Sequence, residues 1–462
     1  MDSVTRPLTL TDHPQQRAGA WAVAIFTARD HPHAVTEDDL DQAARRLVRD
    51  LSRAATTAKT DAGYDWWKVQ FALYPNSKVT HAKRPQTRAA LEPKIAELFI
   101  PDPVAGLGEA PCVFCDKPST VRWAKRNLPL FDAESILNNL PPGLDGWPVC
   151  QGCRIAVWAL PYGAAVTAGS ASVLTSDSLE IERKFAKRNV DRASKIMAAG
   201  FAGLSADAKP EAVAVSMLSH HHVPLGVTLW MFKNDNQEPW LRVTETRQAV
   251  TIFLRRMHTE PAAQRGWKAL IRLLTNRDAQ GNVKESGHDQ AAKTLFEPAG
   301  QRRPRLLETA HALVQRHLAT MPKRWLRDLT ELAHLYSKEM LDMDPTRLKP
   351  VADLIASWIA AATSPRGRFN EYVKAAGKGY PLGGLLMQAE ARLLRNGQTP
   401  PMKAADAQLV VGNGPGAWEH RMLLFFSVVD ALIARGVEIG SKAADEEDNE
   451  IDIQFPEEEE GV

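Results

Sequence analysis

The residues with the clearest capacity for chemistry in this chain are its four cysteines. Cys112 and Cys115 form one C-x-x-C pair, and Cys150 and Cys153 form a second pair after a spacer of 34 residues. Each pair can offer two thiolates to one metal ion, and four thiolates complete the tetrahedral coordination that Zn(II) prefers. Because four protein ligands leave no open position, the spacing predicts a zinc site that is structural and not catalytic.

Two alternatives to the zinc site are a pair of disulfides and four unrelated thiols. The paired spacing argues against unrelated thiols. The N-terminal sequence MDSVTRPLTLTDHP has no basic start followed by an apolar run, so we expect no secretory signal and a cytoplasmic location, where disulfides are rare. No stretch approaches the roughly 18 consecutive apolar residues of a membrane helix, so we expect no membrane partner.

Other motifs offer no catalytic constellation, and we therefore expect a protein that is not an enzyme. Histidines cluster in SHHHVP (219–224), but an extended backbone puts only His220 and His222 on one face, and no acidic residue lies nearby. The glycines of VGNGPGAW (411–418) lack the Lys-Ser/Thr of a phosphate-binding loop. A metal-dependent hydrolase that uses the histidines is the alternative.

Basic and amide side chains are the remaining candidates, because Lys and Arg bind phosphate groups and amides can bind base edges. One group lies in the loop at 76–88, a second in RWAKRN (122–127) within the cysteine spacer, and a third on a predicted helix at 178–204. The candidate DNA-binding residues of these groups are Asn76, Lys78, Lys83, Arg84, Lys125, Arg126, Lys184, Lys187 and Arg188. An ordinary solvated surface is the alternative for each group.

Periodicity predicts the elements that position these residues. Residues 36–58 and 178–204 carry helical patterns, the first with Thr36 as its N-cap. Aromatic and aliphatic residues alternate enough at 66–75 to predict a strand. Two apolar runs around KNDNQEP predict a hairpin at 223–246.

The pattern as a whole predicts an α+β fold, in which a mixed N-terminal domain with an inserted zinc ribbon precedes an all-α C-terminal helical bundle. Residues 306–436 follow the helical period and predict about five helices, and a loop at 274–305 rich in Gly, Asn and Arg marks the boundary before them. The predicted domains are an N-terminal α+β domain (1–108 and 166–300), a zinc-binding insert (109–165), a helical bundle resembling a small subunit (301–442) and an acidic disordered tail (443–462).

Charge is distributed unevenly along the chain. The tail at 443–462 holds ten of the 55 acidic residues and none of the 57 Lys and Arg residues, so residues 1–442 carry 57 basic and 45 acidic side chains. A basic folded part favours a polyanionic partner such as nucleic acid, with a merely solvated surface as the alternative. The tail has too few apolar residues to offset the entropy of ordering it, so we expect it to be disordered.

The order of these features resembles the large subunit of a type I-B CRISPR Cascade complex, of the Cst type in the Cas-eight family. The shared features are an apolar segment near 10–30, a predicted strand that ends in YPNSK, the CVFC…VCQGC cysteines followed by LPYGAA, the segment LWMFKNDNQEPWL, and a helical C-terminal region. The resemblance spans nearly the full chain. It is most specific in the two cysteine pairs and in the FKNDNQ turn.

This resemblance implies a non-catalytic subunit of an RNA-guided surveillance complex in antiviral defence. Such a subunit recognises the protospacer-adjacent motif in target duplex DNA, stabilises the R-loop and recruits a helicase-nuclease in trans. The implied partners are the backbone, handle-binding and small Cascade subunits, the crRNA, and the target double-stranded DNA with its displaced strand. The cofactor expected is structural Zn(II).

Two loops are candidates for contact with this DNA motif. The first is the loop at 76–84, with Asn76, Lys78 and Lys83 nearest the DNA. The second is the FKNDNQ turn, with Asn234, Asn236 and Gln237. An ordinary hairpin turn is the alternative for the second loop. A free-standing, zinc-stabilised DNA-binding or regulatory protein is the alternative function for the chain.

Overall fold

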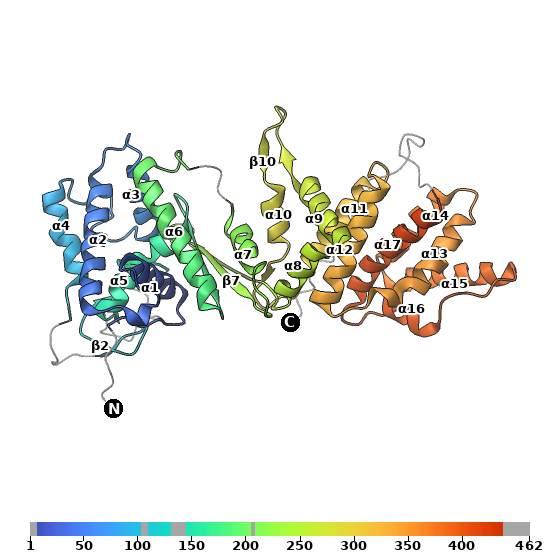
Figure 1. The fold of residues 1–462 in the computed structure, drawn as a ribbon, viewed down its shortest axis with the longest axis horizontal. Helices are drawn as coiled ribbons and strands as arrows, with labels where there is room; N and C mark the ends of the chain where they lie inside the picture. The colour runs from blue at the N-terminus through green and yellow to red at the C-terminus, as the bar shows by residue number, and fades with distance from the viewer. Residues whose placement is uncertain (1–6, 103–109, 131–144, 205–207, 438–462) are drawn as a thin grey trace. The chain divides into compact units, whose positions relative to one another are not determined.

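The computed structural model describes residues 7–102, 110–130, 145–204 and 208–437 (Figure 1). The chain divides into unit 1, which comprises Met1–Arg255 and Thr275–Arg303, and unit 2, which comprises Arg256–Leu274 and Pro304–Val462. Helices and small sheets are both present, so the mixed helix and sheet composition predicted from the sequence is confirmed. The order and limits of the predicted domains stay a prediction.

Helices make up most of unit 1. Their bounds are α1 Pro14–Phe26, α2 Glu37–Thr56, α3 Tyr64–Leu73, α4 Arg88–Ala96, α5 Gln151–Gly163, α6 Leu179–Ala199, α7 Pro210–Leu218 and α10 Gly287–Lys293, and α8 Val250–Thr259 crosses the limit of the unit. Helix α2 begins as the sequence predicts: Thr36 Oγ1 accepts a hydrogen bond from Asp39 N (3.2 Å), and the Asp39 carboxylate accepts one from Thr36 N (2.9 Å). This reciprocal cap satisfies two backbone donors that the helix itself leaves free.

The strand predicted at 66–75 is wrong, because most of this segment forms helix α3. Its buried side chains include Trp66, Val69 and Leu73, which recur every three to four residues as one face of a helix requires. The Trp66 ring lies 4.8 Å from the ring of Tyr162 on α5. Aromatic and β-branched residues raise strand propensity, but packing of this helical face against α5 overrides that weak preference.

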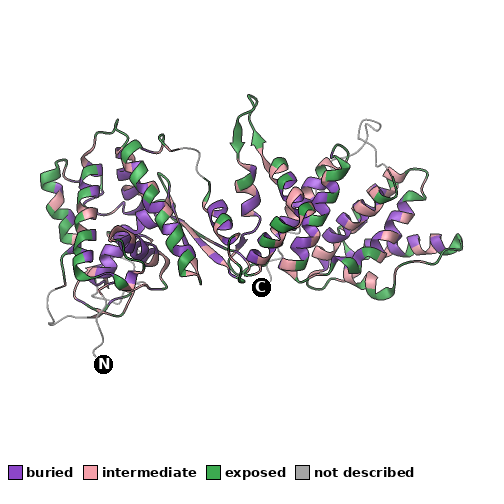
Figure 2. Ribbon diagram, viewed as in Figure 1, coloured by how far each residue is buried: buried purple, intermediate pink, exposed green. Residues whose placement is uncertain are grey.

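The core of unit 1 is built around α5, in which every residue from Gly152 to Gly163 is buried (Figure 2). Helix α1 packs closely against it. A side chain at Gly19 would collide with the backbone of Ala156, and one at Gly163 would collide with the backbone of Ala18. The second cysteine pair is therefore joined to the core of unit 1, because it sits at the start of a helix that belongs to that core.

A small antiparallel sheet completes unit 1. Its strands are β5 Ala165–Val166, β6 Ala171–Ser176, β7 Val227–Lys233, β8 Trp240–Glu245 and β11 Glu297–Pro298, in the order β11-β8-β7-β6-β5. The hairpin predicted at 223–246 is confirmed as β7 and β8, with Met231 opposite Arg242. The helix predicted at 178–204 is confirmed as α6, which follows β6 in the chain and packs against it.

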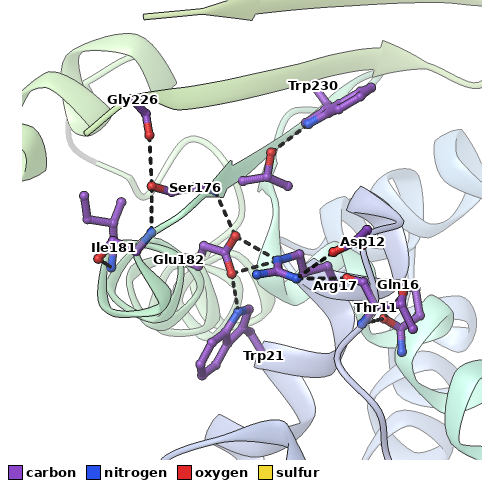
Figure 3. Close-up of polar contacts among 12 residues, drawn as sticks. Thr11, Asp12, Gln16, Arg17, Trp21, Ser176, Ile181, Glu182, Gly226 and Trp230 are labelled. Carbon is purple, nitrogen blue, oxygen red and sulfur yellow. Dashed lines mark hydrogen bonds and ion pairs between the residues drawn. The ribbon is translucent and has the colours of Figure 1, made fainter. Parts of the chain in front are cut away.

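A buried carboxylate links α1, α6 and β6 (Figure 3). Glu182 accepts hydrogen bonds from Arg17 Nε (2.8 Å), Trp21 Nε1 (2.9 Å) and the backbone N–H of Ser176 (2.9 Å). Its side chain is 1% exposed and that of Arg17 is 15% exposed. Because this carboxylate is fully hydrogen-bonded and paired with a cation, its burial is tolerated.

Glu182→Ala should lower the free energy of unfolding by about 3–5 kcal/mol, because it removes the buried counter-charge of the largely buried Arg17 guanidinium, which then keeps only the exposed Asp12 carboxylate at 3.6 Å. The matched control is Glu180→Ala on the same helix, whose exposed carboxylate pairs with Lys184 and whose loss should leave the free energy of unfolding nearly unchanged. Urea unfolding of the full chain measures both values. A loss below about 1 kcal/mol for Glu182→Ala would contradict the structural role of this carboxylate.

The described residues of unit 2 form helices joined by turns and loops and contain no strand. Its helices are α9 Pro261–Leu274, α11 Arg305–His317, α12 Lys323–Leu341, α13 Lys349–Ala360, α14 Pro365–Ala376, α15 Gly379–Arg395, α16 Ala404–Val411 and α17 Ala417–Ala434. The five helices predicted at 306–436 are confirmed as α11, α12, α13, α15 and α17, and α9, α14 and α16 are additional. Helix α9 precedes the predicted bundle in the chain but packs on α12, where Arg265 Nη2 donates to Asp328 Oδ1 (2.8 Å).

None of the helices in the described part of the chain combines the length and hydropathy that crossing a membrane requires.

The core of unit 2 contains an ionisable side chain. His311 on α11 is buried, with its ring 4.7 Å from the ring of Phe425 on α17. Burial lowers the pKa of His311 to about 4, because the apolar surroundings disfavour the protonated form.

The pKa shift of His311 predicts that acid destabilises the protein. Between pH 6.5 and pH 4 the unfolded chain binds a proton at His311 that the folded chain excludes, so the free energy of unfolding should fall by about 3 kcal/mol across this window as pH decreases. His311→Phe removes the titrating group and should flatten this part of the pH dependence. Calorimetric unfolding from pH 7 to pH 4 measures it, and equal slopes in both proteins would show that His311 does not control it.

Candidate metal centre and nucleic-acid interface

The four cysteine sulfurs gather at one point of unit 1. They lie within 4.8 Å of one another, Cys115 Sγ and Cys150 Sγ are 3.5 Å apart, and no disulfide joins them. In a tetrahedral zinc site with Zn–S bonds of about 2.3 Å, the sulfurs are about 3.8 Å apart. The cluster therefore fits a metal ion such as zinc. Among the His, Cys, Asp and Glu side chains that the structure describes, it is the one group close enough to share an ion.

Two different local structures present the two cysteine pairs. The first pair lies on the turn between β1 (Ala110–Pro111) and β2 (Pro118–Ser119), which Asp116 closes with a positive φ of 61°. The second pair lies at the start of α5, where Cys150 is the N-cap residue and Cys153 is in the first turn. A hydrogen bond from Val113 N to Pro148 O (3.0 Å) brings the two segments together.

Two polar side chains lie close to the cysteines. Gln16 Nε2 donates to Cys153 Sγ (3.7 Å), and the buried Arg154 donates to the carbonyls of Leu98 (3.0 Å) and Ile100 (2.8 Å). Burial lowers the pKa of Arg154, and the Asp102 carboxylate at 3.3 Å opposes this change. Hydrogen bonds among the four thiols lower the pKa of Cys112 and raise the pKa of Cys150 and of Cys153. Thiolates are the form that binds a metal ion.

Gln16, Asp102 and Arg154 lie at the candidate metal centre although their positions in the sequence did not predict this. Arg154 directly follows Cys153, and this adjacency of a cation to a thiolate was the one available signal. Asp102 accepts a hydrogen bond from Gln151 N (2.9 Å) at the start of α5. A carboxylate at a helix N-terminus stabilises the helix, so Asp102 supports the element that carries the second cysteine pair.

Three segments with predicted DNA contacts lie side by side in unit 1: the loop at 76–84, RWAKRN (122–127) together with the residues up to Leu130 that follow it, and the FKNDNQ turn. The buried Asn234 in the β7–β8 turn donates to Leu73 O at the end of α3 (2.7 Å) and accepts a hydrogen bond from Leu130 N (3.1 Å). Ser77 in the loop after α3 donates to Asn127 Oδ1 (3.3 Å). The loop at 76–84, the segment at 122–130 and the FKNDNQ turn therefore form one surface, which we call the three-loop surface.

The side chains of Asn76 and Asn236 join two of these loops directly. Asn76 Nδ2 donates to Asn236 Oδ1 (2.9 Å), and Asn236 Nδ2 donates to Asn76 Oδ1 (3.0 Å). Asn236 is exposed and Asn76 is half-buried. The neighbouring Asp235 accepts a hydrogen bond from Gln237 N (2.8 Å) and pairs with Lys233, whose hydrogen bond lowers the pKa of Asp235 to about 2. These contacts link the turn to its own backbone and to the loop after α3.

The basic candidates of the three-loop surface differ in exposure. Lys78, Lys83 and Arg126 are exposed, and Lys125 is half-buried. Arg84 is buried: its guanidinium donates to Ala55 O (Nε, 3.0 Å) and lies 4.2 Å from the centre of the Trp67 ring. The nomination of Arg84 as a surface contact therefore does not agree with its position, because its charged group stabilises the base of the loop.

The candidates on α6 form a separate basic groove of about 750 Å³. Its basic lining residues are Arg183, Lys184, Lys187, Arg188, Arg192 and Lys195. Lys184 pairs with Glu180 at 2.5 Å, and Lys187 pairs with Asp191 at 2.7 Å. Such pairs on an exposed helix surface are weak, so the basic side chains of this groove stay candidates for contact with phosphate groups.

The histidines of SHHHVP do not gather into a metal site. His220 is exposed, and its Nδ1 lies 2.8 Å from Ser216 O. The described residues around it supply no group of metal-binding side chains.

Comparison of the chain with protein-family models, with curated proteins and with solved structures found no match in any of the three.

Proposed function

We propose that this chain is the non-catalytic large subunit of a type I-B CRISPR RNA-guided surveillance complex. It recognises the protospacer-adjacent motif in target duplex DNA through the three-loop surface, stabilises the R-loop, and recruits a helicase-nuclease for antiviral defence. The observation that carries this proposal is that three amide-rich and basic segments, far apart in the sequence, meet on one surface. The assignment to a CRISPR complex and the recruitment step rest on the resemblance of the sequence.

The chemistry of the three-loop surface suits such a role. Exposed lysines contact phosphate groups, which supplies affinity without reading sequence, and amides read base edges. In an RNA-guided complex the guide reads most of the target by base pairing, so the protein needs to recognise only a short motif. It also needs to stabilise the opened DNA slightly, because the RNA–DNA duplex is about as stable as the DNA duplex that it replaces. A compact surface with a few amides and lysines is sufficient for that task.

The cysteine cluster contributes to this function indirectly. We propose that it binds one Zn(II) ion and that the ion is structural, because the four thiolates would occupy the whole coordination shell. The ligands Cys150 and Cys153 begin α5, and Val157 O on that helix accepts a hydrogen bond from Tyr74 at the base of the 76–84 loop. The metal centre therefore stabilises the elements that carry the three-loop surface.

Co-purification tests the proposal. A tagged full chain expressed in a host that carries the repeat array and the neighbouring genes should elute with short guide RNA and with the backbone subunits. The alternative is a free-standing, zinc-stabilised DNA-binding or regulatory protein, which the same surface and metal cluster would also serve. Protein that elutes free of RNA and still binds duplex DNA would reject the proposal and favour this alternative.

A further inference from the structure

The reciprocal amide pair on the three-loop surface has hydrogen-bonding capacity that the protein does not use up. A carboxamide has two N–H donors and an oxygen with two lone pairs. In the pair, Asn76 and Asn236 each use one N–H and one lone pair on the other, at 2.9 and 3.0 Å. Each amide therefore keeps one donor and one acceptor position. On each side of the pair, the remaining N–H of one residue lies beside the remaining lone pair of the other.

A donor beside an acceptor is complementary to one base edge of the DNA major groove. Adenine presents its N6 amino donor beside the N7 acceptor, whereas guanine presents two acceptors, O6 and N7. An edge of the amide pair can therefore form two hydrogen bonds with adenine, but with guanine it places acceptor against acceptor at one of the two positions. The two bases are thus distinguished by hydrogen bonding alone.

The surroundings hold this edge in place and bring it to DNA. Asn234 connects the β7–β8 turn to the end of α3, which fixes Asn236 against Asn76. The Asp235 carboxylate forms an ion pair with Lys233, with Oδ2 and Nζ 2.8 Å apart. Lys78 and Lys83 are exposed on the loop that carries Asn76 and can contact the phosphate groups beside the base.

We propose that Asn76 and Asn236 act together as one base-reading unit that selects adenine over guanine at one position of a target duplex. This inference rests on the proposed function, since it assumes that the three-loop surface meets duplex DNA. It assigns the sequence preference to the pair of amides and not to either residue alone.

Binding of the full chain to duplexes that carry A·T or G·C at each flanking position in turn tests the proposal. The wild type should prefer adenine at one position by about tenfold or more. Asn76→Ala and Asn236→Ala should each reduce this ratio to near one, and the double variant should reduce it no further, because either change destroys the unit. Asn236→Asp keeps the size of the side chain, removes its donors and should also lose the preference. Gln86→Ala, which alters an exposed amide outside the pair, is the control and should keep it.

Three results would overturn the inference: a preference retained in both single alanine variants, an equal loss of affinity for both duplexes, or no preference in the wild type. The second result would show that the pair only connects the loops. The first two results leave salt-dependent duplex binding intact, so the proposed function would survive them, whereas a wild type with no base preference at any flanking position would also count against recognition of the motif. Absence of duplex binding by the wild type would reject the proposed function and the inference with it.

Discussion

Cys112→Ser should reduce bound zinc from one ion per chain to well below one, and should lower the melting temperature of the chain by roughly 10 °C or more. Serine cannot supply a thiolate, so the tetrahedral site loses one ligand. The effect should be large because Cys150 and Cys153 begin α5, around which the core of unit 1 is built. Metal analysis by mass spectrometry and thermal unfolding of the full chain measure the two quantities.

Val113→Ser is the matched control for this experiment. Val113 lies in the same turn as Cys112 but is 42% exposed, so its replacement should leave both the zinc content and the melting temperature nearly unchanged. A zinc chelator should reproduce the effect of Cys112→Ser in the wild type. One zinc ion per chain in purified Cys112→Ser would refute the four-thiolate site.

Charge reversal at Lys78 and Lys83 should weaken binding to target duplex by about tenfold or more at low salt. Each phosphate contact contributes about 0.9 to the slope of log affinity against log salt, so losing two contacts should flatten that slope by about 2. Both lysines are exposed on a loop whose base is buried, so the folded structure should tolerate the changes. Fluorescence anisotropy at several salt concentrations gives the affinity and the slope together.

Lys59→Glu with Lys94→Glu changes the net charge by the same amount at exposed sites of unit 1 outside the three-loop surface. This control variant should lose much less affinity and keep its salt slope, because only groups near the bound phosphates release counterions. If the variant at Lys78 and Lys83 matches wild type in affinity and slope, the loop is not part of the interface, whatever other surface binds DNA.

The sequence predicted correctly those features that depend on neighbouring residues. Thr36 followed by acidic residues caps α2, and the five long amphipathic patterns of the C-terminal half are helices. The two C-x-x-C pairs were sufficient to predict that the four cysteines meet. In each case the determining interaction is local, or the chemistry of the residue type leaves few alternatives.

Predictions failed where long-range packing outweighed local preference. The aromatic-rich segment at 66–75 forms helix α3, because a helix buries Trp66, Val69 and Leu73 on one face. Arg84 belongs to a basic run in the sequence, yet its guanidinium is held inside unit 1 by Ala55 O. Neither outcome is visible in the segment itself, since the partners lie elsewhere in the chain.

What the sequence by itself determined is the chemical content of this protein: four thiols with metal-binding spacing, a basic folded part, and several short stretches of lysines and amides. What only the tertiary structure decided is which of these stretches act together. Asn76 and Asn236 are 160 residues apart in the chain and hydrogen-bonded in space, while α6 carries its cations in a separate groove. Hydrogen bonds such as those of Asn234 require the core to hold α3 and β7 together, and spacing along the chain does not encode that proximity.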